Sequence, residues 1–101
     1  MLTGKQKRFL RGLGHGLKPV LHIGKHAVNE TVLAETDAAL ATHELIKVKI
    51  LEGCEMDRHE VAEALAKATK GDVAQVLGRT LLLYRKGDEP KIELPAASGK
   101  K

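Results

Sequence analysis

The chain has 101 residues, of which 43% are hydrophobic and 30% are charged, with 17 Lys and Arg against 13 Asp and Glu. This length predicts one folded domain, and the apolar fraction excludes a disordered chain because it is large enough to build a core. One Phe, one Tyr and no Trp exclude the domains that stack nucleic-acid bases on several exposed aromatic rings.

Positive charge is concentrated at the start of the sequence. Residues 1–26 contain six basic side chains and no acidic one, whereas the remaining residues contain 11 basic and 13 acidic ones, so the net charge of +4 divides into +6 and −2. Such a one-sided distribution produces a directed field that attracts a polyanion. The six residues are Lys5, Lys7, Arg8, Arg11, Lys18 and Lys25.

The basic segment predicts a helix followed by a strand. A helix is expected over residues 3–14, with Thr3 as its N-cap. Its basic side chains occupy one face, and a run of β-formers closed by Gly24 predicts a strand over residues 19–23. The apolar stripe that we expect to face the core consists of Phe9, Leu10, Leu13 and Leu17.

The middle of the chain predicts a second helix and a second strand. The helix is expected over residues 27–42. Residues 45–50 alternate, so their apolar side chains should face the core while Lys47 and Lys49 face the other way. Those lysines would either contact a polyanion or extend over a helix that covers this face.

The last part predicts a helix over residues 57–69, with Asp57 as N-cap, and a hairpin of strands 73–77 and 80–85 joined by Gly78-Arg79. Beyond Lys86 the periodicity is lost, and we expect a loosely held tail. The order α-β-α-β-α-β-β predicts a single α/β domain with a four-stranded mixed sheet and at least one parallel pair. We assign the domain to residues 1–95 and a flexible basic tail to residues 96–101.

The loop Gly24-Lys25-His26-Ala27 is the first candidate binding element. A loop between a strand and a helix exposes backbone N–H groups, and a helix N-terminus would add positive charge there. Lys25 would contribute a full charge. The alternative is that Gly24 only turns the chain and Lys25 is solvated. The basic helix in the same acid-free segment favours a phosphate site.

Catalytic and metal sites are not expected. The lone Cys54 is flanked by Glu52 and Glu55, which raise rather than lower the pKa of a thiol. His22 and His26 straddle a strand end and a loop without further ligands at metal-binding spacing. We therefore expect no enzyme, cofactor or metal. A single cysteine and the absence of a signal or membrane-spanning pattern favour the cytoplasm.

Several segments together resemble the CRM domain of the YhbY-like RNA-binding protein family. The resemblance extends from Leu2 to about Pro95. Its most specific parts are His43-Glu44-Leu45-Ile46-Lys47-Val48-Lys49 and Gly78-Arg79-Thr80-Leu81-Leu82-Leu83-Tyr84-Arg85. Further matches are residues 3–13, 17–20, 24–27 and 32–35.

The resemblance implies a fold similar to the C-terminal domain of translation initiation factor three, and RNA binding through a Gly-x-x-Gly loop. Gly24, Lys25 and His26 correspond to the first three positions of that loop, and Ala27 stands where its last glycine is expected. If position 27 requires a positive φ, alanine is strained there. If position 27 is already helical, alanine is favourable.

Our main hypothesis is a non-enzymatic, monomeric RNA-binding factor that docks on ribosomal RNA of the large subunit or its precursor, in the pre-50S particle. The RNA-binding residues would be Lys5, Lys7, Arg8, Arg11, Lys18, Gly24, Lys25, His26 and Ala27. One alternative is a protein-interaction module that a ribosomal protein or an assembly GTPase recruits to ribosomes, with the acidic helices as its contact surface. Another is an RNA-processing enzyme that uses His22 and His26.

Overall fold

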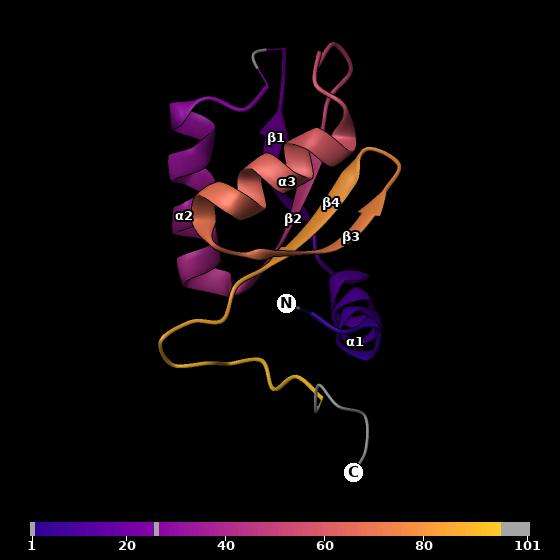
Figure 1. Ribbon diagram of the computed structural model, residues 1–101, viewed down its shortest axis with the longest axis vertical. Helices are drawn as coiled ribbons and strands as arrows, with labels where there is room; N and C mark the ends of the chain where they lie inside the picture. The colour runs from indigo at the N-terminus through magenta and orange to yellow at the C-terminus, as the bar shows by residue number, and fades with distance from the viewer. Residues whose placement is uncertain (1, 26, 96–101) are drawn as a thin grey trace.

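The computed structural model describes residues 2–25 and 27–95. Their element order is the predicted one (Figure 1). The elements are α1 (Gly4–Gly14), β1 (Pro19–Ile23), α2 (Glu30–His43), β2 (Leu45–Ile50), α3 (Arg58–Thr69), β3 (Asp72–Leu77) and β4 (Thr80–Tyr84). None of the helices in this part of the chain is long and apolar enough to cross a membrane.

The four strands form one mixed sheet in the order β1-β2-β4-β3. β1 and β2 are parallel, whereas β4 is antiparallel to both β2 and β3. The tight turn between β3 and β4 uses the positive φ of Gly78 (+59°), a conformation that suits glycine. The predicted mixed sheet, parallel pair and terminal hairpin are therefore confirmed.

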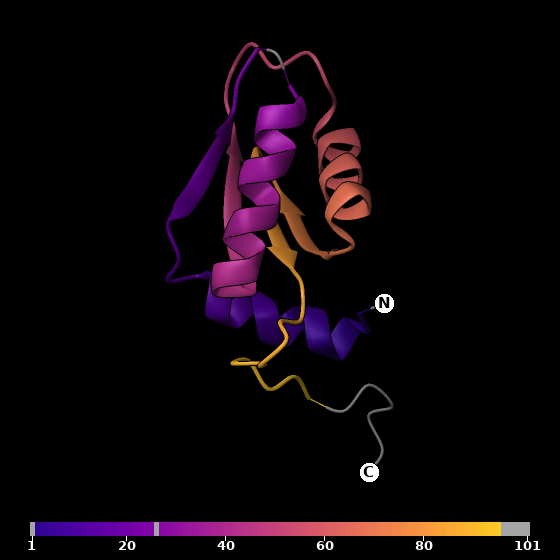
Figure 2. The same cartoon turned by 90° about the vertical axis from the view of Figure 1, so that its left-hand side faces the viewer.

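The two faces of the sheet are covered differently. α2 and α3 pack on one face, where alternate residues such as Ile46, Val48, Leu81 and Leu83 form the main core. α1 packs on the other face near one end, where a smaller cluster includes Leu10, Leu45 and Leu82. Figures 1 and 2 show α2 and α3 beside the upper sheet and α1 across its lower end. α1 thus leaves part of its face of the sheet uncovered.

The predicted apolar stripe of α1 is wrong in three of its four members. Leu10 is buried, but Phe9, Leu13 and Leu17 are exposed. The buried stripe consists instead of Gln6, Leu10 and Gly14. A Cβ at position 14 would lie 2.9 Å from both Leu82 methyl groups, so glycine lets the helix approach the sheet along this line.

The segment after β4 is held in place, in contrast to the loose tail expected beyond Lys86. The buried Glu44 carboxylate accepts hydrogen bonds from the backbone N–H groups of Gly87 (2.7 Å), Lys91 (2.8 Å) and Ile92 (3.0 Å). Farther along, Gln6 Nε2 donates to the carbonyl of Pro95 (3.0 Å). The predicted flexible tail, residues 96–101, lies outside the described residues.

Glu44 is the centre of this attachment. It ends α2 with a positive φ of +64° and is 2% exposed. Burial raises the pKa of its carboxyl, but the three N–H donors and the nearby Lys91 charge lower it by more, so the pKa lies below the ordinary value of 4.5. A charged carboxylate with three donors is a stable arrangement despite its burial.

We expect Glu44→Gln to lower the free energy of unfolding by about 2–3 kcal/mol, because a buried amide has one acceptor oxygen and turns its NH₂ group toward a backbone N–H. Urea denaturation at neutral pH measures the effect. Glu35→Gln is the control on the same helix, where the side chain is exposed, and should change the value by less than about 0.5 kcal/mol.

Acidification gives a second readout of the same contact. Because the folded pKa is lowered, the unfolded state takes up a proton at Glu44 at a higher pH than the folded state does. The contribution is therefore present above pH 4.5 and is lost as the pH falls through the folded pKa. The difference in unfolding free energy between the native protein and Glu44→Gln should shrink on acidification. A difference that does not change with pH would contradict this role.

Candidate functional site

α1 carries its basic side chains without acidic neighbours. The helix is capped by Thr3, whose hydroxyl accepts the N–H of Gln6 (3.1 Å). Lys5, Lys7 and Arg8 are exposed, and Arg11 is half-buried. Because α1 contains no Asp or Glu, its cations have no intrahelical partner and remain available to an external anion.

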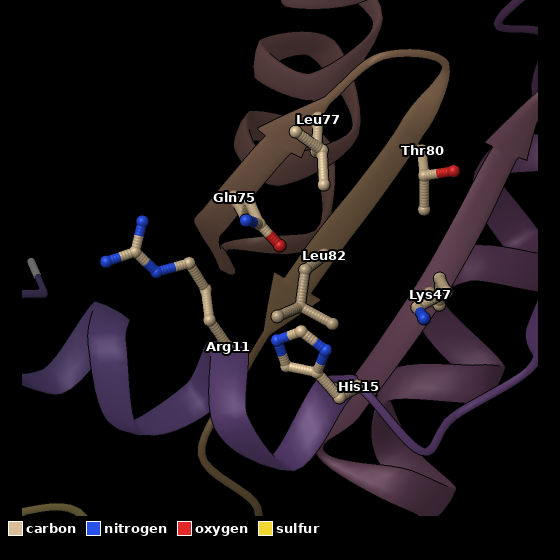
Figure 3. Close-up of a pocket in the computed structure, with 8 residues that line it drawn as sticks. Arg11, His15, Lys47, Gln75, Leu77, Thr80 and Leu82 are labelled. Carbon is tan, nitrogen blue, oxygen red and sulfur yellow. The ribbon is translucent and has the colours of Figure 1, made fainter.

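The cationic surface of α1 continues onto the uncovered part of the sheet. A pocket of about 180 Å³ lies between the helix and the strands. Figure 3 shows Arg11 rising from α1 on the side of Gln75, and His15, which follows the helix, beside Leu82 below the strands that carry Lys47 and Thr80. None of the described residues that line this pocket is acidic. We call this combination of the α1 cations and the uncovered sheet the basic face.

Strand register extends the basic face beyond the pocket. Lys49 of β2 lies between His22 of β1 and Thr80 of β4, and Thr80 is paired with Leu77 of β3. Lys49 and His22 are exposed. The side chains of Lys47 and Lys49 thus lie on the face that α1 only partly covers, opposite the main core, as the alternation of β2 predicts.

The Gly24–Ala27 loop forms a turn that ends β1. The N–H of Ala27 donates to the carbonyl of Gly24 (3.0 Å), and Lys25 is exposed. Ala27 has a φ of +54° and is 8% exposed. Of the two conformations that the sequence left open at position 27, Ala27 therefore adopts the left-handed one, in which glycine is favoured. His26 lies outside the described residues.

The prediction that a helix begins at this loop is wrong. α2 begins at Glu30, three residues later than predicted, because Asn29 caps it by accepting the N–H of Val32 (2.9 Å). The Asn29 side chain already accepts one free N–H group at the start of α2, and the carboxylate of Glu30 already lies at the positive end of the helix dipole. Any anion held by the turn must therefore rely on Lys25 and the turn itself.

The structure does not bring α1 and the turn together. The link between β1 and α2 lies at the top of both views, whereas α1 lies at the bottom (Figures 1 and 2). The five residues of β1 separate them, a span of about 16 Å. Lys18 is exposed at the start of this span, beside Leu13 and Leu17.

Two cations of the last hairpin, Arg79 and Arg85, are paired with carboxylates. Arg79 pairs with Glu52 (3.6 Å). Arg85 donates to Asp37 Oδ1 (2.6 Å) and to the carbonyl of Thr69 (2.9 Å), which ties α2 and α3 to the end of β4. Its role is structural.

Sequence reasoning missed part of the basic face. The spacing of the first helix places His15 on its basic side, but the predicted RNA-binding set omits it. His22 is predicted only as a possible ligand or catalyst, and the sequence leaves the role of Lys47 and Lys49 open. Alternation indicated that both lysines lie opposite the main core, but only the strand order shows what lies beside them. Among the described residues, no group of three or more His, Cys, Asp or Glu is placed to hold a metal ion.

Comparison with known proteins assigns the chain to a family. The sequence model of the CRS1/YhbY (CRM) domain matches residues 2–85. A protein of Bacillus subtilis, named probable RNA-binding protein YqeI, is 48% identical over 96 residues, which cover 94% of this chain and all of that protein. A protein of Haemophilus influenzae, named RNA-binding protein, is 44% identical over 94 residues, covering 93% and 95% of the two chains.

The same architecture occurs in a solved structure. The solution structure of SAV1595 from Staphylococcus aureus, described as a candidate RNA-binding protein, superposes with a TM-score of 0.80 at 44% sequence identity. The superposition covers 94% of this chain and all of the other. The fold predicted from the sequence is thus confirmed.

The strained turn gives a testable series at position 27. We expect Ala27→Val to lower the free energy of unfolding by about 1–2 kcal/mol, because a β-branched residue is poorly accommodated at positive φ. Ala27→Gly should change it by less than about 1 kcal/mol, because relief of strain offsets the greater freedom of the unfolded chain. Denaturant titration measures both variants. Ala34→Val, on the exposed side of α2, is the control and should cost only about 0.5 kcal/mol.

Proposed function

Because the chain belongs to the CRS1/YhbY (CRM) domain family, we propose that it binds RNA as an assembly factor of the large ribosomal subunit. Its RNA would be large-subunit ribosomal RNA or the precursor in the pre-50S particle. The names of its relatives as RNA-binding proteins support the first part of this proposal. In the simplest form of this role, the protein is a monomer in the cytoplasm that binds RNA and catalyses no reaction.

The observation that carries the proposal is the scarcity of carboxylates on the basic face. α1, β1, β2 and β4 contain no Asp or Glu, and β3 contains only Asp72, its first residue. In contrast, α2 contains Glu30, Glu35 and Asp37 and no Lys or Arg. The protein therefore has one side that is rich in positive charge and another that is rich in negative charge. A polyanion approaching it is attracted to the side formed by α1 and the uncovered sheet and is repelled from α2.

The geometry supports docking over an extended length of RNA. The α1 cations would hold one end, the Gly24–Ala27 turn with Lys25 would hold a phosphate at the other, and Lys47 and Lys49 lie between. An RNA must extend over at least about 16 Å to reach both ends. A structured segment recognised by its backbone and shape fits this requirement.

The aromatic side chains do not favour base stacking on the basic face. Tyr84 is buried, and burial, followed by the charges of Glu44 and Asp72, raises the pKa of its phenol. Phe9 is exposed but lies away from the pocket that Arg11 and His15 line. Contacts with phosphates and sugars would therefore provide most of the affinity.

We expect Arg8→Glu with Lys25→Glu to abolish RNA binding at physiological salt, a loss of more than about 100-fold, because two phosphate contacts become repulsive. Filter binding with purified large-subunit ribosomal RNA measures the dissociation constant. The single substitutions should contribute additively because the residues lie far apart. Where binding remains measurable, the slope of log K against log salt should be shallower by about 2.

A matched control places the same change of charge elsewhere. Lys67→Glu with Lys70→Glu, at the exposed end of α3, alters the net charge equally and should leave the affinity within about threefold. Circular dichroism checks that both double variants fold. Equal loss in the two would mean that net charge, rather than the basic face, governs binding, and unchanged affinity of Arg8→Glu with Lys25→Glu would refute the mechanism.

The assembly role is tested in cell lysate on a sucrose gradient. At low salt the protein should sediment with particles of the large subunit, and at high salt it should dissociate, because contacts with phosphates weaken steeply with ionic strength. Antibody detection follows the native protein and the Arg8→Glu, Lys25→Glu variant. Recovery of native protein only at the top of the gradient, at both salt concentrations, would contradict a ribosomal role.

A further inference from the structure

An apolar groove lies on the flank of α1 away from Arg11. Its volume is about 450 Å³, and Leu13, Leu17 and Val20 contribute exposed side chains to it. Leu45 and Ile46 of β2 and Ile92 of the C-terminal segment complete the lining. The groove therefore lies beside β1, a strand at the edge of the sheet.

The groove is part of a longer apolar stripe. Phe9 is 40% exposed, Leu13 43%, Leu17 36% and Val20 48%. Phe9 lies one helical turn before Leu13 on α1, whereas Leu17 follows the helix and Val20 belongs to β1. Scattered apolar side chains are normal on a protein surface, but a contiguous set around a groove indicates a binding surface.

The rim of the groove carries two cations, Lys18 and Lys47. His43 also lines the groove, and none of its described lining residues is acidic. Lys47 lies between this groove and the pocket of the basic face, because it lines both. An occupant should therefore present apolar side chains to the floor and carboxylates to the rim.

We propose that this groove binds an acidic amphipathic helix of a partner protein. Such a segment lays one apolar face into a groove through residues at i, i+4 and i+7. The stripe from Phe9 to Val20 offers matching contacts along its length, and the cationic rim selects the charge of the flanking residues. The partner and the RNA would occupy neighbouring surfaces that meet at Lys47.

Two other occupants fit less well. A nucleobase would fill the groove but would leave Phe9, outside the groove lining, uncovered. A second copy of this chain, docked through the same surface, would bring two cationic rims together, which opposes association. Neither uses both the length of the stripe and the charge of its rim.

The test uses the full chain labelled with ¹⁵N and a synthetic helical peptide of about 16 residues, four to five turns. The peptide carries Leu at i, i+4, i+7 and i+11 and Glu at the flanking positions. NMR titration should give a dissociation constant of about 1 mM or tighter, with shifts at Leu13, Leu17 and Val20. Replacing every Glu of the peptide by Lys, or every Leu by Ser, should weaken binding at least tenfold.

Variants of the protein assign the site. Leu13→Gln with Val20→Thr changes two exposed side chains and should weaken peptide binding at least tenfold while leaving affinity for ribosomal RNA unchanged. Leu51→Gln, at another exposed position, is the matched control and should change neither. This RNA measurement separates failure of the groove from failure of RNA binding on the basic face.

Four outcomes would overturn the proposal. They are no saturable binding of the acidic peptide, binding that the groove variant does not weaken, loss of RNA affinity in that variant, and a dimer in sedimentation equilibrium that the variant dissociates. The third would assign the groove to a nucleobase, and the fourth would assign it to a second copy of the chain.

Discussion

The close approach of Gly14 to Leu82 sets the orientation of α1, and the surfaces of the protein follow from it. Glycine lets the end of this helix lie so near the sheet without displacing Leu82, since a Cβ would reach within 2.9 Å of both Leu82 methyl groups. The helix consequently rests on Gln6, Leu10 and Gly14. This rotation turns Arg11 and His15 toward the uncovered strands and leaves Phe9 and Leu13 exposed on the other flank. A rotation that buried the predicted apolar stripe would have removed the groove.

The contact between Gly14 and Leu82 also explains why one feature, the buried face of α1, could not be predicted from the sequence. Every helix and strand was predictable, because alternation in β2, the capping box of α3 and the glycine turn of the hairpin are local signals. The buried face of α1 was not, because a glycine and a glutamine lie in the buried stripe while three large apolar residues do not. Hydrophobic periodicity assumes that apolar side chains are buried, and the exposed Phe9 and Leu13 of α1 break that assumption.

The sequence predicted some residues of the candidate site, but neither the rest of the basic face nor its layout. Charge asymmetry identified the α1 cations and Lys25, and φ at Ala27 agrees with a glycine-type position in the loop. The separation of α1 from the turn depends on the direction of β1, and the place of Lys47 and Lys49 depends on the strand order. Both are consequences of tertiary pairing, which no local pattern specifies. The late start of α2 has a local cause, the Asn29 cap, that helical periodicity concealed.

Glu44 links the stability of the fold to the proposed partner surface. Its carboxylate receives the N–H groups of Lys91 and Ile92, and Ile92 lines the apolar groove. A buried charge on a residue with positive φ is costly unless its contacts compensate, and three backbone donors supply that compensation. The C-terminal segment is thereby fixed without a helix or strand of its own, and it completes the groove. The Glu44 carboxylate thus helps to shape the groove in which we propose that an acidic partner binds. Its own charge is buried and is compensated by three backbone N–H groups, so it does not oppose such a partner.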